Sequence, residues 1–177
     1  MKDHLGKSFG LTIAFLIPGM VALYALAYFM PELRTWFGLV SERPTTVGGF
    51  LFVVVGSFGV GVIVSGVRWF LCDRFLAPQV SLNTQRRREG ETEAAYQALI
   101  ANHYQYYQFY ANTSVALAWL FLCWLIANDP GWAAALQRLV FLAVAAGALL
   151  LFAHDAMKKF NRKALQLLGS PQRETSA

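Results

Sequence analysis

The chain has 177 residues, of which 56% are hydrophobic and 14% charged, with a net charge of +5 and a mean hydropathy of +0.43. This composition excludes a soluble domain, because soluble domains carry about 25% charged residues. A bilayer core about 30 Å thick needs roughly 20 apolar residues per helix, and four segments approach that length. The predicted membrane spans are residues 9–30, 48–71, 108–127 and 132–154.

Each span is too long for a strand of a membrane barrel, which needs about ten residues, so helices are expected. We predict an all-α fold, a single four-transmembrane-helix bundle over residues 1–168. Helices 3 and 4 are expected to extend into the cytoplasm over 92–107 and 155–168. The tail 169–177 is expected to be disordered.

The distribution of lysine and arginine predicts the orientation of the bundle. Twelve of the 15 basic residues lie before span one, at or beyond the C-terminal end of span two, or after span four. The positive-inside rule therefore places both termini and the segment 72–107 in the cytoplasm. We expect a multi-pass protein of the cell (inner) membrane, surrounded by membrane lipids.

Span one carries Pro18-Gly19 near its middle. A proline removes one helical hydrogen bond, so the pair indicates either a gating hinge or a kink that neighbouring helices cover. We favour the covered kink. The residues Ala25-Leu26-Ala27 resemble a signal-peptide cleavage site, but the apolar run continues to Met30, which favours a retained anchor.

Span two has small residues at four-residue intervals, Ser57, Gly61 and Ser65. They fall on one helix face, where another backbone can approach closely. This face is predicted to pack either within the bundle or between subunits of a homo-oligomer. The lining of a narrow pore is a third interpretation.

The connector 77–91 is expected to be a loop, because it contains Gly90 and a polar run. Its Arg86-Arg87-Arg88 cluster is followed by three glutamates at 89, 91 and 93. Balanced charges of this kind indicate a solvated loop rather than a nucleic-acid site.

The third helix is expected to start near Thr92 and to cross the membrane up to Ala127. Its residues 94–110 are rich in tyrosine at helical spacing, which predicts a packing surface outside the bilayer. Asn112, Thr113 and Ser114 follow within the inner leaflet, where polar side chains bond across helices. At comparable depth, the predicted partners are Ser65, Arg68 and His154.

The fourth span follows a tight turn at 128–131, so spans three and four are expected to be antiparallel neighbours. Beyond it, 155–168 alternates basic and apolar residues at helical spacing. This amphipathic helix is predicted either to lie on anionic lipid or to pack on the cytoplasmic half of helix 3. We favour the second, because helix 3 has an apolar stripe of its own to cover.

A polar cluster is expected at the cytoplasmic end of the bundle, drawn from three helices. Its members are Arg68, Asp73, Arg74, His103, Tyr107, Asn112, His154 and Asp155. The cluster indicates a pocket for an anionic headgroup or small ligand, a metal site of two histidines and two aspartates, or a network that orients the helices. We favour the network and predict no metal, no cofactor and no catalytic residue, because no catalytic motif is present.

Two functional hypotheses follow from the sequence. In the first, the protein is not an enzyme and oligomerises to act as a membrane scaffold, pore or effector, for instance in a bacterial defence system. A cytoplasmic protein partner would then meet the surfaces 94–110 and 155–168. In the second, it is a small membrane enzyme or a lipid- or ligand-binding protein that uses the polar cluster.

Overall fold

The computed structural model describes residues 2–40, 46–73 and 99–168. The described residues are helical and contain no strand, which confirms the all-α class. The elements in chain order are α1 (Lys2–Leu26), α2 (Pro31–Trp36), α3 (Val47–Arg68), η1 (Trp69–Asp73), η3 (Ile100–Tyr104), α6 (Gln105–Asn128) and α7 (Trp132–Leu168).

Among the described residues, three helices are long and apolar enough to cross a membrane. They run over Val47–Leu71, Gln105–Asn128 and Trp132–Ala164. The apolar stretch described in α1, Thr12–Leu26, is shorter. The molecule is therefore a helical membrane protein with at least three segments that fit a bilayer.

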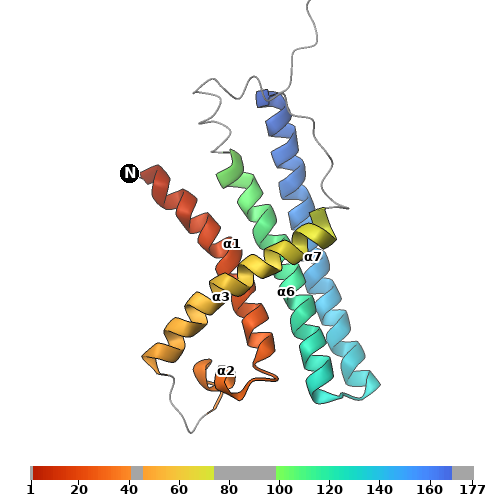
Figure 1. Ribbon diagram of the computed structural model, residues 1–177. Coiled ribbons are helices and arrows are strands. Elements are labelled where there is room, and N and C mark those ends of the chain that lie inside the picture. Colours follow the sequence, from red (N-terminus) through yellow and green to blue (C-terminus); the bar gives the residue numbers. More distant parts are fainter. Residues whose placement is uncertain (1, 41–45, 74–98, 169–177) are drawn as a thin grey trace, which may run out of the picture.

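Local sequence signals explain where several helices begin and end. The side chain of Thr46 caps α3 by accepting a hydrogen bond from the backbone N–H of Gly49 at 3.1 Å. Asp129 ends α6 in the left-handed conformation, with φ 41°. The turn that follows places α7 antiparallel to α6 (Figure 1).

One expectation about helix limits is wrong. The first helix ends at Leu26 rather than near Met30, because residues 27–29 form a turn. The segment that follows contains the short helix α2, which Pro31 starts at its first position. The expected loop 77–91, the helix start at Thr92 and the tail 169–177 lie outside the described residues.

The helices form two packed groups that share α6 (Figure 1). In the first group, α1 packs against both α3 and α6, and α3 crosses α1 at a steep angle. In the second, α7 runs alongside α6 and η3. Two small cores hold the first group and one holds the second.

Candidate functional site

The centre of the first group is a hydrogen bond between Asn112 of α6 and the backbone of α1. The side-chain Nδ2 of Asn112 donates to the carbonyl oxygen of Ala14 at 2.9 Å, and Asn112 is completely buried. In a helix this carbonyl would accept from the residue four positions later, which here is Pro18 and has no N–H. Asn112 therefore satisfies the carbonyl that the proline leaves without a partner.

This contact bears on two predictions from the sequence, the partner of Asn112 and the role of Pro18. Asn112 had been expected to bond with Ser65, Arg68 or His154, and the partner is instead the α1 backbone. Ser114 also bonds locally, donating from its hydroxyl to the carbonyl of Tyr110 at 3.0 Å. Since Pro18 is fully buried among its neighbours, the geometry agrees with a proline covered by other helices rather than an open hinge.

The backbones of α1 and α3 touch one turn further along. A Cβ atom added to Gly19 would collide with the carbonyl oxygen of Ser57, and one added to Gly61 would collide with that of Phe15. Only glycine allows this approach at both positions. The Ser57 and Gly61 face thus packs against α1 within the chain, while Ser65 is half-buried.

A third contact joins α1 to α6 nearer the start of both helices. The side chain of Gln105 is buried and lies against the backbone at Gly10, where a Cβ would collide with its amide. Ala22, Val64 and Ala116 form a small apolar core on the other side of the Asn112 contact. We call this region, from Gly10 to Ala22 of α1 with its partners on α3 and α6, the three-helix junction.

The expected polar cluster does not come together as one site. Arg68 and Tyr107 do meet: both are buried, and the guanidinium carbon lies 5.2 Å from the centre of the tyrosine ring. This is the geometry of a cation–π contact. Asn112 is engaged with α1 instead, and His154 is exposed.

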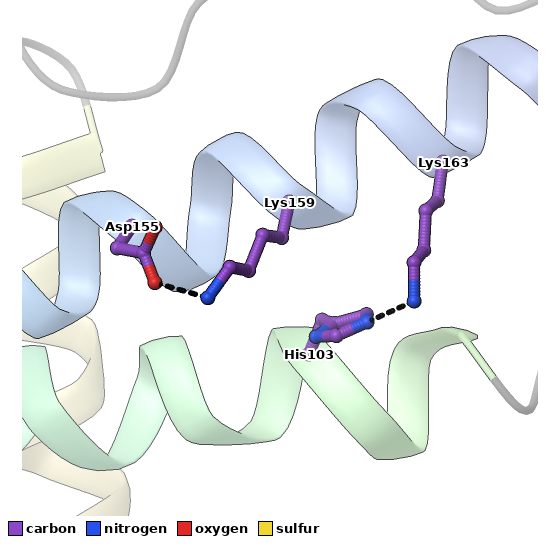
Figure 2. A network of polar contacts seen from close by, with 4 residues as sticks. All are labelled: His103, Asp155, Lys159 and Lys163. Carbon is purple, nitrogen blue, oxygen red and sulfur yellow. Dashed lines mark hydrogen bonds and ion pairs between the residues drawn. The ribbon is translucent and has the colours of Figure 1, made fainter.

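Two further members take part in a separate surface network (Figure 2). The Lys163 ammonium lies 2.9 Å from Nε2 of His103 and donates to it when the imidazole is neutral. One turn before Lys163 in α7 is Lys159, which forms an ion pair with Asp155 at 2.6 Å. Partial burial, followed by the charges of Lys163 and Lys159, lowers the pKa of His103 below its usual 6.5.

Two members of the predicted cluster cannot be compared with the structure. Arg74 and the side chain of Asp73 lie outside what the structure describes. Within the described ranges, no group of three or more histidine, cysteine, aspartate or glutamate residues is placed to hold a metal ion.

Beyond the junction, the last part of α7 packs on η3 and the start of α6, as favoured from the sequence. The ring of Phe160 packs at a tilt against that of Tyr104, with ring centres 5.5 Å apart, and the ring centre of Phe152 lies 5.7 Å from that of Tyr110. Between these aromatic pairs, Tyr107 packs with three alanines. The tyrosine-rich surface is thus partly covered by the same chain.

Sequence reasoning missed the α1 side of the junction. Ala14, Gly10 and Gly19 carry no side-chain chemistry, and they matter through their backbones. One available signal was the proline itself, since Pro18 identifies the carbonyl of Ala14 as the one that needs a donor.

No protein-family model, curated protein or solved structure matches this chain.

Proposed function

We propose that this chain is a non-enzymatic membrane protein whose helices cross the bilayer four times, with both termini in the cytoplasm. It self-associates through the outer face of α3 and acts as a membrane scaffold, pore or effector. The arrangement of α1 supports four crossings, because α1 packs along α6 with its start at the same end as the C-terminal end of α7 (Figure 1). The excess of basic residues at that end favours the cytoplasm.

The length of α7 supports a cytoplasmic extension. Its 37 residues reach about 55 Å at 1.5 Å per residue, well beyond a hydrocarbon core of about 30 Å. The part in excess includes Lys158, Lys159, Arg162 and Lys163. Charged side chains of this density belong in water rather than in lipid.

The observation that carries self-association is a second glycine face on α3. Gly59 and Gly66 are seven residues apart and fall on one side of the helix, opposite Gly61. A Cβ added to either would meet no atom within 4 Å among the described residues. Uncovered glycines are where a helix of another subunit can come close, and small residues are enriched at such membrane interfaces.

The positions of the polar residues favour this function over an enzyme. Asn112 holds the α1 backbone, Arg68 lies over Tyr107, and His103 and Asp155 each contact a lysine of α7. These contacts join helices or stabilise α7. They support the interpretation of the cluster as a set of orienting contacts.

Subunit counting in lipid vesicles tests the proposal. Single-molecule photobleaching of the labelled wild-type protein should show several subunits per complex. Gly59→Leu and Gly66→Leu should reduce this to one, because a large side chain on the outer face keeps helices apart. The matched control is Gly147→Leu on α7, another glycine with nothing within 4 Å, and it should leave the number unchanged.

A single photobleaching step for the wild type would overturn self-association. Unchanged stoichiometry in Gly59→Leu and Gly66→Leu would show that the interface lies elsewhere than on α3.

A further inference from the structure

The end of α7 that packs on η3 carries a lysine whose partner is a base rather than an acid (Figure 2). The Lys163 ammonium lies 2.9 Å from Nε2 of His103 in η3. Neither side chain forms another hydrogen bond or ion pair with the described part of the chain. Lys163 is exposed and His103 is half-buried, so the amine can be reached from solvent. π-Helical turns such as η3 are frequent at functional sites.

The other two lysines of this segment have different surroundings. Lys159 forms an ion pair with Asp155. The hydrogen bond from Lys159 holds the pKa of Asp155 below its usual range, so this carboxylate is a weak base. Lys158 is exposed and forms no hydrogen bond or ion pair within the described ranges. The segment thus presents one lysine beside an imidazole, one beside a carboxylate and one beside neither.

The imidazole of His103 is available as a base at neutral pH. Three charged groups face it from α7: Lys163 and Lys159, which lower its pKa, and Asp155, which raises it. Partial burial has the largest effect, and the pKa lies below 6.5 as a result. The ring is therefore largely neutral at pH 7, and its Nε2 accepts a proton when the ring proton is on Nδ1.

An imidazole at this distance can assist acyl transfer to the lysine. When Lys163 attacks an acyl carbon as the free amine, the tetrahedral adduct carries an ammonium N–H. This proton must leave before the leaving group departs, because otherwise the adduct returns to the reactants. Nε2 of His103 lies within the range of about 2.6–3.2 Å expected of a general base, and can take the proton.

The charge around Lys163 selects the acyl donor. Between residues 155 and 164, α7 carries four basic side chains and one acidic side chain. A positive surface of this kind attracts anionic reactants. An acyl phosphate is a dianion near neutral pH, and its phosphate is a good leaving group.

We infer that Lys163 is a site of acylation by acyl phosphates, with His103 as the base. The lysine nitrogen bonds to the acyl carbon, and the bond between this carbon and the phosphate oxygen breaks. The amine proton passes through His103 to the released phosphate, so the products are an amide and inorganic phosphate. Acylation removes the charge of Lys163 and with it the ammonium that bonds His103. The reaction does not depend on self-association through α3.

Acetylation of the purified full chain in detergent tests the inference. Acetyl phosphate is added at about pH 7.5, and mass spectrometry of peptides gives the rate at each lysine. Lys163 should react at least about tenfold faster than Lys158. This is less than the roughly 10²–10⁴-fold that general bases contribute in enzymes, because the two side chains are only partly held in place. Lys159 should be no faster than Lys158.

The variant His103→Asn separates a hydrogen-bond acceptor from a base. The oxygen of asparagine can accept a hydrogen bond from Lys163, but it cannot take up a proton. The rate at Lys163 should therefore fall to that at Lys158, and the rate at Lys158 should not change. Equal rates at the two lysines in the wild type would overturn the inference. So would an advantage of Lys163 that persists in His103→Asn.

The pH dependence provides a second readout. In the wild type, the ratio of the rates at Lys163 and Lys158 should fall as the pH drops below 6.5 through the pKa of His103. An imidazolium cannot accept another proton, so its assistance is lost there. In His103→Asn the ratio should stay constant. A constant ratio in the wild type between about pH 5.5 and 7.5 would also overturn the inference.

Discussion

The three-helix junction and the α6–α7 hairpin are held together by different means. At the junction, helix backbones touch at Gly19 and Gly61, and a buried amide bridges α6 to α1. In the hairpin, contact is made by alanines and aromatic rings towards the end of α7. In the most apolar stretch of 18 residues in α7, no residue is buried. In the corresponding stretches of α3 and α6, 28% and 33% of the residues are buried.

This difference shows what joins helices in a bilayer. Lipid tails are as apolar as leucine, so apolar surface alone does not drive helices together. Helices are held together instead by close approach at small residues and by hydrogen bonds between helices. The junction has both, whereas the spanning part of α7 presents large exposed side chains such as Phe141 and Leu151. We therefore expect the junction to tolerate change poorly and the outer face of α7 to tolerate it well.

The largest effect is expected at Gly61. Gly61→Ala places a methyl group against the carbonyl of Phe15, and α1 and α3 must separate. We expect a loss of about 3 kcal/mol in the free energy of unfolding, measured by denaturant titration in detergent. Gly147→Ala, in α7 and outside the proposed subunit interface, with no atom within 4 Å among the described residues, should change it by less than about 0.5 kcal/mol. Equal effects would contradict a backbone contact at Gly61.

A smaller effect is expected in the hairpin. Phe160→Ala removes the ring that packs against Tyr104. It should lower the free energy of unfolding by about 1–2 kcal/mol, since an aromatic pair adds about 0.5–1.5 kcal/mol to the burial it provides. The matched control is Phe141→Ala, whose ring is 78% exposed. It should have almost no effect in the same titration. A larger loss from Phe141→Ala would show that this face of α7 is covered.

The smallest effect concerns pH. Because the pKa of His103 lies below 6.5 in the folded protein, the unfolded chain binds more protons just below pH 6.5. Stability is therefore complete above that pH and falls as the pH drops through the folded pKa. The loss should stay below about 1 kcal/mol, since His103 is only partly buried and its neighbours are exposed. His103→Asn should flatten this part of a melting-temperature profile between pH 5 and 7. A profile unchanged by the substitution would assign the dependence to another group.

The sequence predicted the features that depend on periodicity. Runs of apolar residues located the helices α3, α6 and α7, and the Ser57–Gly61 spacing identified a face that packs closely. The alternation in 155–168 indicated that the end of α7 would pack on the tyrosine-rich segment 94–110, and Phe160 contacts Tyr104 of η3 in that segment. These patterns are local, so they can be interpreted without knowing which helices are neighbours.

What the sequence could not supply was the direction in which each polar group points. Residues at equal depth were grouped as one cluster, yet Arg68 and His154 face different surroundings. A comparison of depth alone would have included Ala14 among the candidate partners of Asn112, because Ala14 lies about as far into the first predicted span as Asn112 does into the third. The choice between them needs the rotation of each helix, which arises from tertiary packing.

The most direct test of the account is a double-mutant cycle between Asn112 and Pro18. Asn112→Ala leaves the Ala14 carbonyl without a donor and should lower the free energy of unfolding by about 1 kcal/mol, typical of interhelical hydrogen bonds in membranes. In a Pro18→Ala background, residue 18 gains an N–H that can bond this carbonyl within α1. The same Asn112→Ala change should then have almost no effect, a coupling of about 1 kcal/mol. Equal losses in the two backgrounds would contradict the account, because Asn112 would then stabilise the fold without replacing the bond that Pro18 removes.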